Sequence, residues 1–130
     1  LLVVLVADHG YPWPRSLSYN EPLRHRIPMI WTGGAVAGPR VVEEYASQID
    51  ICATILGQLE VAHDDFDYSK DIFAPTPPYY TFNDGFGVVD ASGEAVWDAT
   101  SGKAVSETSP ALMDVGRTML QTTYTDIGNR

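Results

Sequence analysis

The chain has few basic residues, a single cysteine and no long hydrophobic run, and each shortage excludes a class of protein. Lys and Arg number 8 against 17 Asp and Glu residues, which gives a formal net charge of -9. Binding to a nucleic-acid backbone requires a cluster of Lys and Arg, so we expect no nucleic-acid partner. The same charge disfavours binding to an anionic membrane surface.

The chain also lacks a segment that could cross a membrane or direct export. The longest continuous apolar run covers residues 1–7, whereas a spanning helix needs about 20 apolar residues. No charged segment precedes this run, so it does not read as a signal peptide. A chain that opens on LLVVLVADHG, without a methionine or a polar lead-in, is expected to have been cut from a longer protein in the middle of a sheet.

What is present is the composition of a globular domain, with 45% hydrophobic and 19% charged residues. A chain of 130 residues can bury about two-thirds of the surface that its unfolded state exposes. The single cysteine, Cys52, cannot form an internal disulfide, so the redox compartment stays open. Because Cys52 falls within a helical pattern, we expect a buried structural thiol rather than a nucleophile.

The first half of the chain has the pattern strand, loop, strand, helix, which is typical of an α/β fold. Residues 1–7 form a uniformly apolar strand of the kind that is covered on both faces within a parallel sheet, so part of its cover is expected to be missing. A second strand of about six residues is predicted near Pro28, at a strand start or a sheet edge. Residues 47–59 have helical spacing, with Ser47 as the predicted N-cap.

The second half predicts a small antiparallel subdomain. Short β-type runs are separated by Asn83-Asp84-Gly85, Ser92-Gly93 and Ser101-Gly102, which are hairpin signals. We therefore expect a meander of about three or four strands. The aromatic residues of these runs are expected to pack in the sheet, and Asn83-Asp84 to form a turn rather than a catalytic pair.

A terminal helix is predicted after the meander, with Ser109 as its N-cap, Pro110 in its first turn and its end near Tyr124. The predicted domains are an α/β part over residues 1–75 and an antiparallel β subdomain with the terminal helix over residues 76–130.

Two side chains that commonly bind metals, Asp8 and His9, follow the first strand directly. Neighbours on a strand point to opposite faces, but Gly10 lets the chain leave the sheet, so that both side chains can reach one ion. The carboxyl end of a strand is also where open α/β sheets place their ligands. Carboxylate plus imidazole suits zinc or manganese better than calcium. A solvated turn after a core strand is the alternative that the dipeptide leaves open.

Three ordered motifs extend this pattern: Asp8-His9-Gly10, Arg26-Ile27-Pro28-Met29-Ile30 and Asp50-Ile51-Cys52-Ala53-Thr54-Ile55-Leu56. Together they resemble the carboxyl-terminal part of the sulfatase-type catalytic domain in the alkaline phosphatase superfamily. The stretches PMIWTGGAV, ATILGQL, HDDFDYSKDI and YYTFNDGFG are most similar to lipoteichoic acid synthase-like phosphoglycerol transferases and the related phosphoethanolamine transferases. The resemblance spans residues 1–105.

The resemblance implies the terminal part of an alkaline-phosphatase-like sheet and an enzyme that transfers or hydrolyses phosphate or sulfate esters. Its cofactor would be a divalent metal, Mn²⁺ by preference, with Zn²⁺, Ca²⁺ and Mg²⁺ as alternatives. Asp8 and His9 would be metal ligands. The remaining ligands and the nucleophile, a threonine or a modified cysteine, would lie upstream. This chain alone is therefore expected to be inactive.

The same resemblance implies a location outside the cytoplasm, in the periplasm or at the cell surface, with a membrane anchor upstream. The expected substrate is a phosphate or sulfate ester such as a phosphoglycerol-type lipid head group. A strand cut from its sheet should also expose an apolar patch or cover it by self-association. The competing interpretation is a non-catalytic binding or regulatory module, in which residues 8–10 form only a turn.

His25, just before the second strand, is the candidate catalytic residue. Imidazole is suited to bind a phosphate oxygen or to protonate a leaving alcohol near neutral pH. Arg24 and Arg26 are candidates for bidentate contacts to the substrate anion, and Arg15 is a further candidate for that role. The alternative, left open by the sequence, is a surface cluster that pairs with Glu21.

A second group of metal-type residues follows the predicted helix and consists of His63, Asp64, Asp65 and Asp67. It precedes a proline-rich connection, where carboxylates commonly form turns through local bonds to the backbone. We therefore expect turn formers here rather than a metal site.

Overall fold

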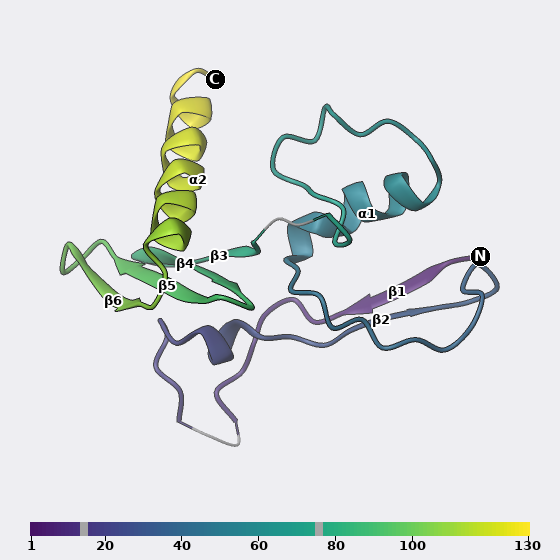
Figure 1. Cartoon of the computed structure of the whole chain (residues 1–130), viewed down its shortest axis with the longest axis horizontal. Coiled ribbons are helices and arrows are strands. Elements are labelled where there is room, and N and C mark those ends of the chain that lie inside the picture. Colours follow the sequence, from purple (N-terminus) through teal and green to yellow (C-terminus); the bar gives the residue numbers. More distant parts are fainter. Residues whose placement is uncertain (14–15, 75–76) are drawn as a thin grey trace.

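The computed structural model describes residues 1–13, 16–74 and 77–130 and shows a mixed α/β chain with two antiparallel sheets. Figure 1 shows the smaller sheet and α1 on one side of the molecule and the larger sheet with α2 on the other. The smaller sheet contains β1 (Val3–Val6) and β2 (Met29–Thr32). The larger has the order β3 (Tyr79–Phe82), β4 (Gly85–Asp90), β5 (Gly93–Asp98) and β6 (Lys103–Glu107).

The helical elements are short in the first half of the chain and long at its end. They are the 3-10 helices η1 (Pro22–His25) and η2 (Gln48–Asp50) and the α-helices α1 (Ile51–Gln58) and α2 (Pro110–Gly128). In the part of the chain that the structure describes, no helix combines the length and the apolar character needed to cross a bilayer.

The first strand forms as predicted but in a different environment. β1 pairs with β2 in antiparallel register, with Leu5 opposite Ile30. These two side chains are 55% and 57% exposed. The sequence predicts β1 inside a parallel sheet, but its described partner β2 is antiparallel, so this prediction is wrong. The expected exposed apolar patch is present. As expected, part of the cover of β1 is missing, because within the described ranges β1 and β2 form a sheet of their own with no third strand.

Ser47 is the N-cap of the 3-10 helix η2, and α1 begins three residues later than predicted, at Ile51. The Asp50 carboxylate accepts a hydrogen bond from the Ser47 N–H at 2.7 Å, and the Ser47 hydroxyl donates to the Tyr79 carbonyl at 2.7 Å. One correction concerns Cys52, which is exposed rather than buried. The cause is the rotation of α1, since Ala53 and Thr54 occupy its buried face and leave Cys52 outside.

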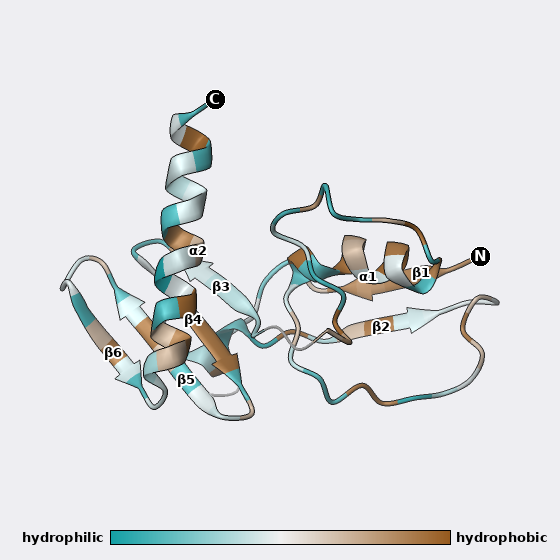
Figure 2. Ribbon diagram, turned by 45° about the horizontal axis from the view of Figure 1, so that its top comes forward, coloured by the Kyte–Doolittle hydropathy of each residue, from teal (hydrophilic) through white to brown (hydrophobic). Residues whose placement is uncertain are grey.

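The main core lies between the meander and α2, as Figure 2 illustrates with α2 standing against the larger sheet. The buried residues that form it are Phe86, Val88, Ala95, Leu112 and Met113. The predicted meander is confirmed with 4 strands, and the predicted N-terminal end of α2 at Pro110 is confirmed. The helix ends at Gly128, beyond the predicted Tyr124, and this last part is solvated, since Tyr124 is 66% exposed.

The opposite face of the meander contacts the first half of the chain. On β3, the rings of Tyr80 and Phe82 lie over Gly87 and Gly85 of β4, which have no side chains to displace them. The ring of His25, the last residue of η1, stacks on Tyr80 with 4.3 Å between centroids. This contact brings η1 and the meander together.

Candidate metal and anion site

Asp8 and His9 lie beyond the carboxyl end of β1, on the surface. Their side chains are 89% and 74% exposed, and Asp8 Oδ2 lies 3.7 Å from His9 Nε2. The backbone beneath them is held by the Gln48 amide, which donates to the carbonyl of Ala7 and, at 3.2 Å, to that of Asp8. The start of the η2–α1 helix thus fixes the end of β1 and the position of the pair.

The hydrogen bonds of the pair leave one atom of each side chain for a ligand. Asp8 Oδ1 accepts the His9 N–H at 3.0 Å, which leaves Oδ2 free. His9 Nδ1 lies 2.9 Å from the Gly10 carbonyl oxygen. Because a carbonyl oxygen only accepts, Nδ1 carries the proton and Nε2 keeps its lone pair in the neutral ring. A ring N–H on a backbone carbonyl is the usual support of a metal-binding histidine.

The separation of Oδ2 and Nε2 fits two ligands of one divalent ion. Bonds of about 2.1 Å at a tetrahedral angle place two donor atoms about 3.4 Å apart, and wider angles increase this distance. The observed 3.7 Å lies close to that range. The same distance also fits a weak ion pair if His9 is protonated. Among the described residues, no group of 3 or more His, Cys, Asp or Glu side chains is placed to hold a metal.

An open depression of about 530 Å³ lies next to the pair and contains two further candidates. From the first half of the chain it is lined by His9, Gly10, Tyr19, Arg24 and His25, and from the meander by Thr81, Phe82, Asn83 and Asp84. The structure therefore brings together one predicted metal ligand, the candidate catalytic histidine and one candidate substrate-binding arginine. Asp8 stands beside the depression and does not line it.

His25 is held by its surroundings in one orientation. Its Nε2 lies 2.7 Å from the Tyr19 carbonyl oxygen, so this nitrogen carries a proton. The ring is stacked on Tyr80 and lies 6.0 Å from the ring of Phe82. Burial, and to a smaller extent the negative charge of Glu94, raises the pKa of Tyr80, which keeps its hydroxyl neutral. Nδ1 of His25 is the nitrogen left for a ligand.

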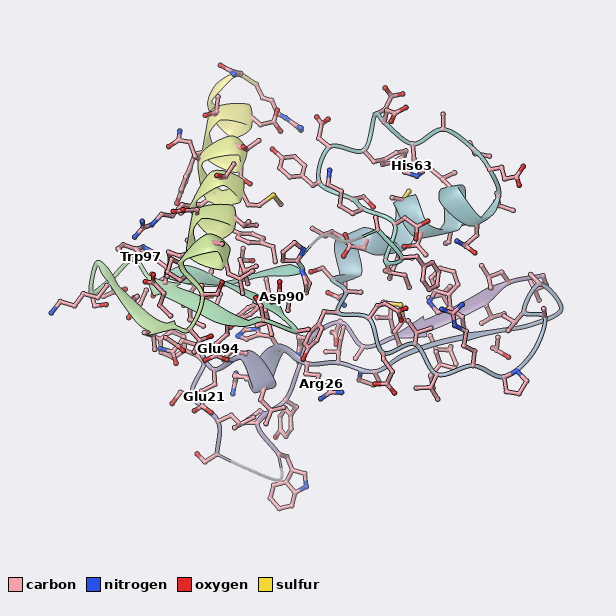
Figure 3. The ribbon with its side chains drawn as sticks, in the orientation of Figure 1. Glu21, Arg26, His63, Asp90, Glu94 and Trp97 are labelled. Carbon is pink, nitrogen blue, oxygen red and sulfur yellow. The ribbon has the colours of Figure 1, made fainter. Side chains whose placement is uncertain are left out.

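The three arginine candidates have different outcomes. Arg24 lines the depression, and its guanidinium makes a long hydrogen bond of 3.5 Å to the Leu17 carbonyl. Arg26 is exposed and does not line the depression, and Figure 3 labels it at the end of η1. Arg15 lies outside the described residues. The alternative pairing is not found in the described ranges, because the Glu21 carboxylate accepts the Ser18 N–H at 2.7 Å and forms no ion pair with Arg24 or Arg26.

His63 and its neighbouring carboxylates lie apart from this site. Figure 3 shows His63 on the loop after α1, away from Glu21 and Arg26. The loop there turns through the hydrogen bond from the Phe66 N–H to the His63 carbonyl at 3.1 Å. This turn is closed by the backbone, so the predicted role of the neighbouring carboxylates as turn formers stays a prediction.

The motif that contains Asp50 and Thr54 has a structural role. The Asp50 carboxylate accepts N–H groups from Ser47 and, at 3.1 Å, from Lys70. The Thr54 hydroxyl accepts the Ile72 N–H at 3.0 Å. Burial raises the pKa of Asp50, although the two N–H groups and the Lys70 charge act in the opposite direction. These contacts attach the loop after α1 to the helix.

For two residues of the depression, Asn83 and Asp84, the sequence predicts a turn rather than a catalytic pair. They do form the β3–β4 turn, but they also line the depression next to Arg24 and His25. The hairpin signal marked the turn correctly. No local pattern indicated which part of the first half of the chain would lie opposite it.

Comparisons of this chain with models of protein families, with curated proteins and with solved structures gave no significant match.

Proposed function

We propose that this chain contributes a pair of metal ligands and part of an anion-binding surface to a metal-dependent enzyme acting on phosphate or sulfate esters. The proposed enzyme is a sulfatase-type member of the alkaline phosphatase superfamily, with phosphoglycerol or phosphoethanolamine transfer as the preferred activity. The observation that supports this most is the geometry of Asp8 Oδ2 and His9 Nε2, 3.7 Å apart beside a depression that contains Arg24 and His25.

The roles in this proposal follow from the atoms that each side chain leaves free. Asp8 Oδ2 and His9 Nε2 hold the divalent cation, and the other ligands and the nucleophile come from other parts of the enzyme. When bound, the cation neutralises charge on the ester and lowers the pKa of a coordinated hydroxyl. Arg24 offers its guanidinium to the ester oxygens. With Nε2 held by Tyr19, His25 accepts or returns the proton of an alcohol at Nδ1.

A second candidate is a non-catalytic binding or regulatory module, in which residues 8–10 form only a turn. The packing of His25 favours it, because stacking on Tyr80 and a hydrogen bond to Tyr19 also describe a histidine that only connects two parts of the fold.

Metal binding by the 130-residue chain tests the first step. Mn²⁺ should broaden the backbone NMR signals of residues 6–11 selectively, because its unpaired electrons relax nearby nuclei. Asp8→Ala and His9→Ala should each weaken this effect by about tenfold or more in Mn²⁺ concentration. The matched control is His63→Ala, which removes a histidine beside carboxylates in the loop after α1 and should leave the effect unchanged. Broadening of the NMR signals around His63, and not of those of residues 6–11, would contradict the proposal.

Activity separates the enzyme from the binding module. In the enzyme that contains this chain, Mn²⁺-dependent cleavage of a phosphodiester should be abolished by Asp8→Ala and by His9→Ala. Full activity in both variants would contradict the proposal that this chain belongs to such an enzyme. Absence of turnover in the unmodified enzyme, together with no selective effect of Mn²⁺ on residues 6–11, would favour the non-catalytic module.

A further inference from the structure

The depression beside Asp8 and His9 has two walls with different chemistry. The wall from the first half of the chain carries Arg24, whose guanidinium binds anions, beside His9 and His25. The opposite wall is the β3–β4 turn, where Asn83 and Asp84 offer an amide and a carboxylate. A ligand that fills the depression therefore meets positive charge on one side and hydrogen-bond acceptors on the other.

The turn presents these two side chains on a fixed backbone. The Asp84 carbonyl accepts the Ala99 N–H at 2.6 Å, and Phe82 is paired with Gly85 across the turn. Both side chains are exposed, and in the described ranges neither has a hydrogen-bond partner of its own. Their polar atoms are thus left for a ligand, while the backbone that carries them is held in the sheet.

The two walls are connected by aromatic contacts. The ring centroid of Phe82, the residue before the turn, lies 6.0 Å from His25 and 5.6 Å from Tyr19. The His25 ring also stacks on Tyr80 of the same strand. This packing fixes the distance between the basic wall and the turn before any ligand binds, so little ordering is needed on binding.

We infer that the β3–β4 turn determines the specificity of the site, with Asn83 and Asp84 binding hydrogen-bond donors on the alcohol part of a phosphate ester. The phosphate of that ester lies against Arg24 and His25. Hydroxyl and ammonium groups both supply such donors, and a carboxylate accepts either. The inference rests on the proposed function, because it uses the same anion-binding wall and adds the recognition of the alcohol.

The test compares phosphate compounds that share the anion and differ in the alcohol. NMR titrations of the 130-residue chain would use inorganic phosphate, ethyl phosphate, glycerol phosphate and ethanolamine phosphate. Asp84→Ala and Asn83→Ala should weaken binding of glycerol or ethanolamine phosphate by about five- to tenfold, since each removes one or two hydrogen bonds. Both variants should leave inorganic and ethyl phosphate unchanged. Asp114→Ala, which removes an exposed carboxylate on α2, is the matched control and should change no affinity.

The outcomes separate this inference from the proposed function. A loss confined to ethanolamine phosphate identifies an ammonium group as the recognised donor, and a loss with glycerol phosphate identifies hydroxyl groups. If Arg24→Ala weakens all four compounds while Asp84→Ala and Asn83→Ala change none, the anion site stands and the role of the turn is wrong. Equal weakening of all four compounds by Asp84→Ala would also overturn the role. Phosphate binding that does not depend on Arg24 would overturn both.

Discussion

Asp50 illustrates how one carboxylate holds two segments that are distant in sequence. It is 8% exposed, and its two oxygens accept the N–H groups of Ser47 and Lys70. A carboxylate suits this position because it has two acceptor atoms and no donor. The position of Asp50 in the third sequence motif is thus explained by the local structure.

Replacing Asp50 with asparagine should destabilise the fold. The amide has one acceptor and one donor group, so one of the two part-buried N–H groups would face an N–H₂ group. We expect a loss of about 1–3 kcal/mol in the free energy of unfolding at pH 7, measured by urea denaturation. The control is Asp65→Asn in the exposed loop after α1, which should cost less than about 0.5 kcal/mol.

The pH dependence of that loss has a defined sign. The pKa of Asp50 is raised by burial above 3.8, so the folded state holds the proton more tightly than the unfolded state. The stability that this adds is present below about 3.8 and is lost as the pH rises through the raised pKa. The difference between the wild type and Asp50→Asn should therefore shrink as the pH rises across this window. A difference that grows with pH would show that the carboxylate hydrogen bonds outweigh burial.

At the scale of elements, α2 is held against the meander by a close contact at a glycine. A Cβ atom added at Gly116 would overlap the ring of Phe86, which is 0% exposed. The interior is packed too densely for the ring to move without cost. The absence of a side chain at this position is what lets the helix approach β4.

Gly116→Ala should therefore destabilise the chain by about 1–3 kcal/mol, even though alanine favours a helix by about 1 kcal/mol over glycine. Gly128→Ala, at the end of the same helix, is the matched control, because no atom lies within 4 Å of its added Cβ. That control should be neutral or slightly stabilising. The midpoint of urea denaturation measures both, and an equal shift for the two variants would rule out the contact with Phe86 as the cause.

Local signals predicted the elements better than their surroundings. The hairpin dipeptides predicted the meander, Ser47 marked the start of the helical segment that opens with η2, and Pro110 marked the start of α2. Turns and caps are predictable because they depend on a few neighbouring residues. The exposure of Cys52 was missed, since the pattern cannot tell which face of a short helix meets a loop that is 16 or more residues away. The turn at Asn83 and Asp84 was placed correctly, but its approach to Arg24 depends on long-range packing.

At the scale of the whole molecule, the candidate site depends on contacts between the halves of the chain, several of which involve β3. The Ser47 hydroxyl donates to the Tyr79 carbonyl at 2.7 Å, and His25 stacks on Tyr80, the next residue. These contacts converge on β3, which therefore connects the meander to the part of the chain that carries Asp8 and His9. His9 after β1 and a turn more than 70 residues later line one depression because the end of β3 packs against η1.

The exposed face of the smaller sheet predicts self-association. β1 and β2 each have one unpaired edge in the part of the chain that the structure describes, and Leu5 and Ile30 form a directly opposite apolar pair that is more than half exposed. Burying two such side chains against a second surface contributes about 1–2 kcal/mol each. Leu5→Lys and Ile30→Lys should each weaken association by about tenfold in sedimentation equilibrium, because burying a lysine charge on this face is costly. Val105→Lys, on the 50% exposed position of β6, should leave it unchanged. A chain that stays monomeric at all concentrations, or that associates equally well with all three substitutions, would contradict a role for this face.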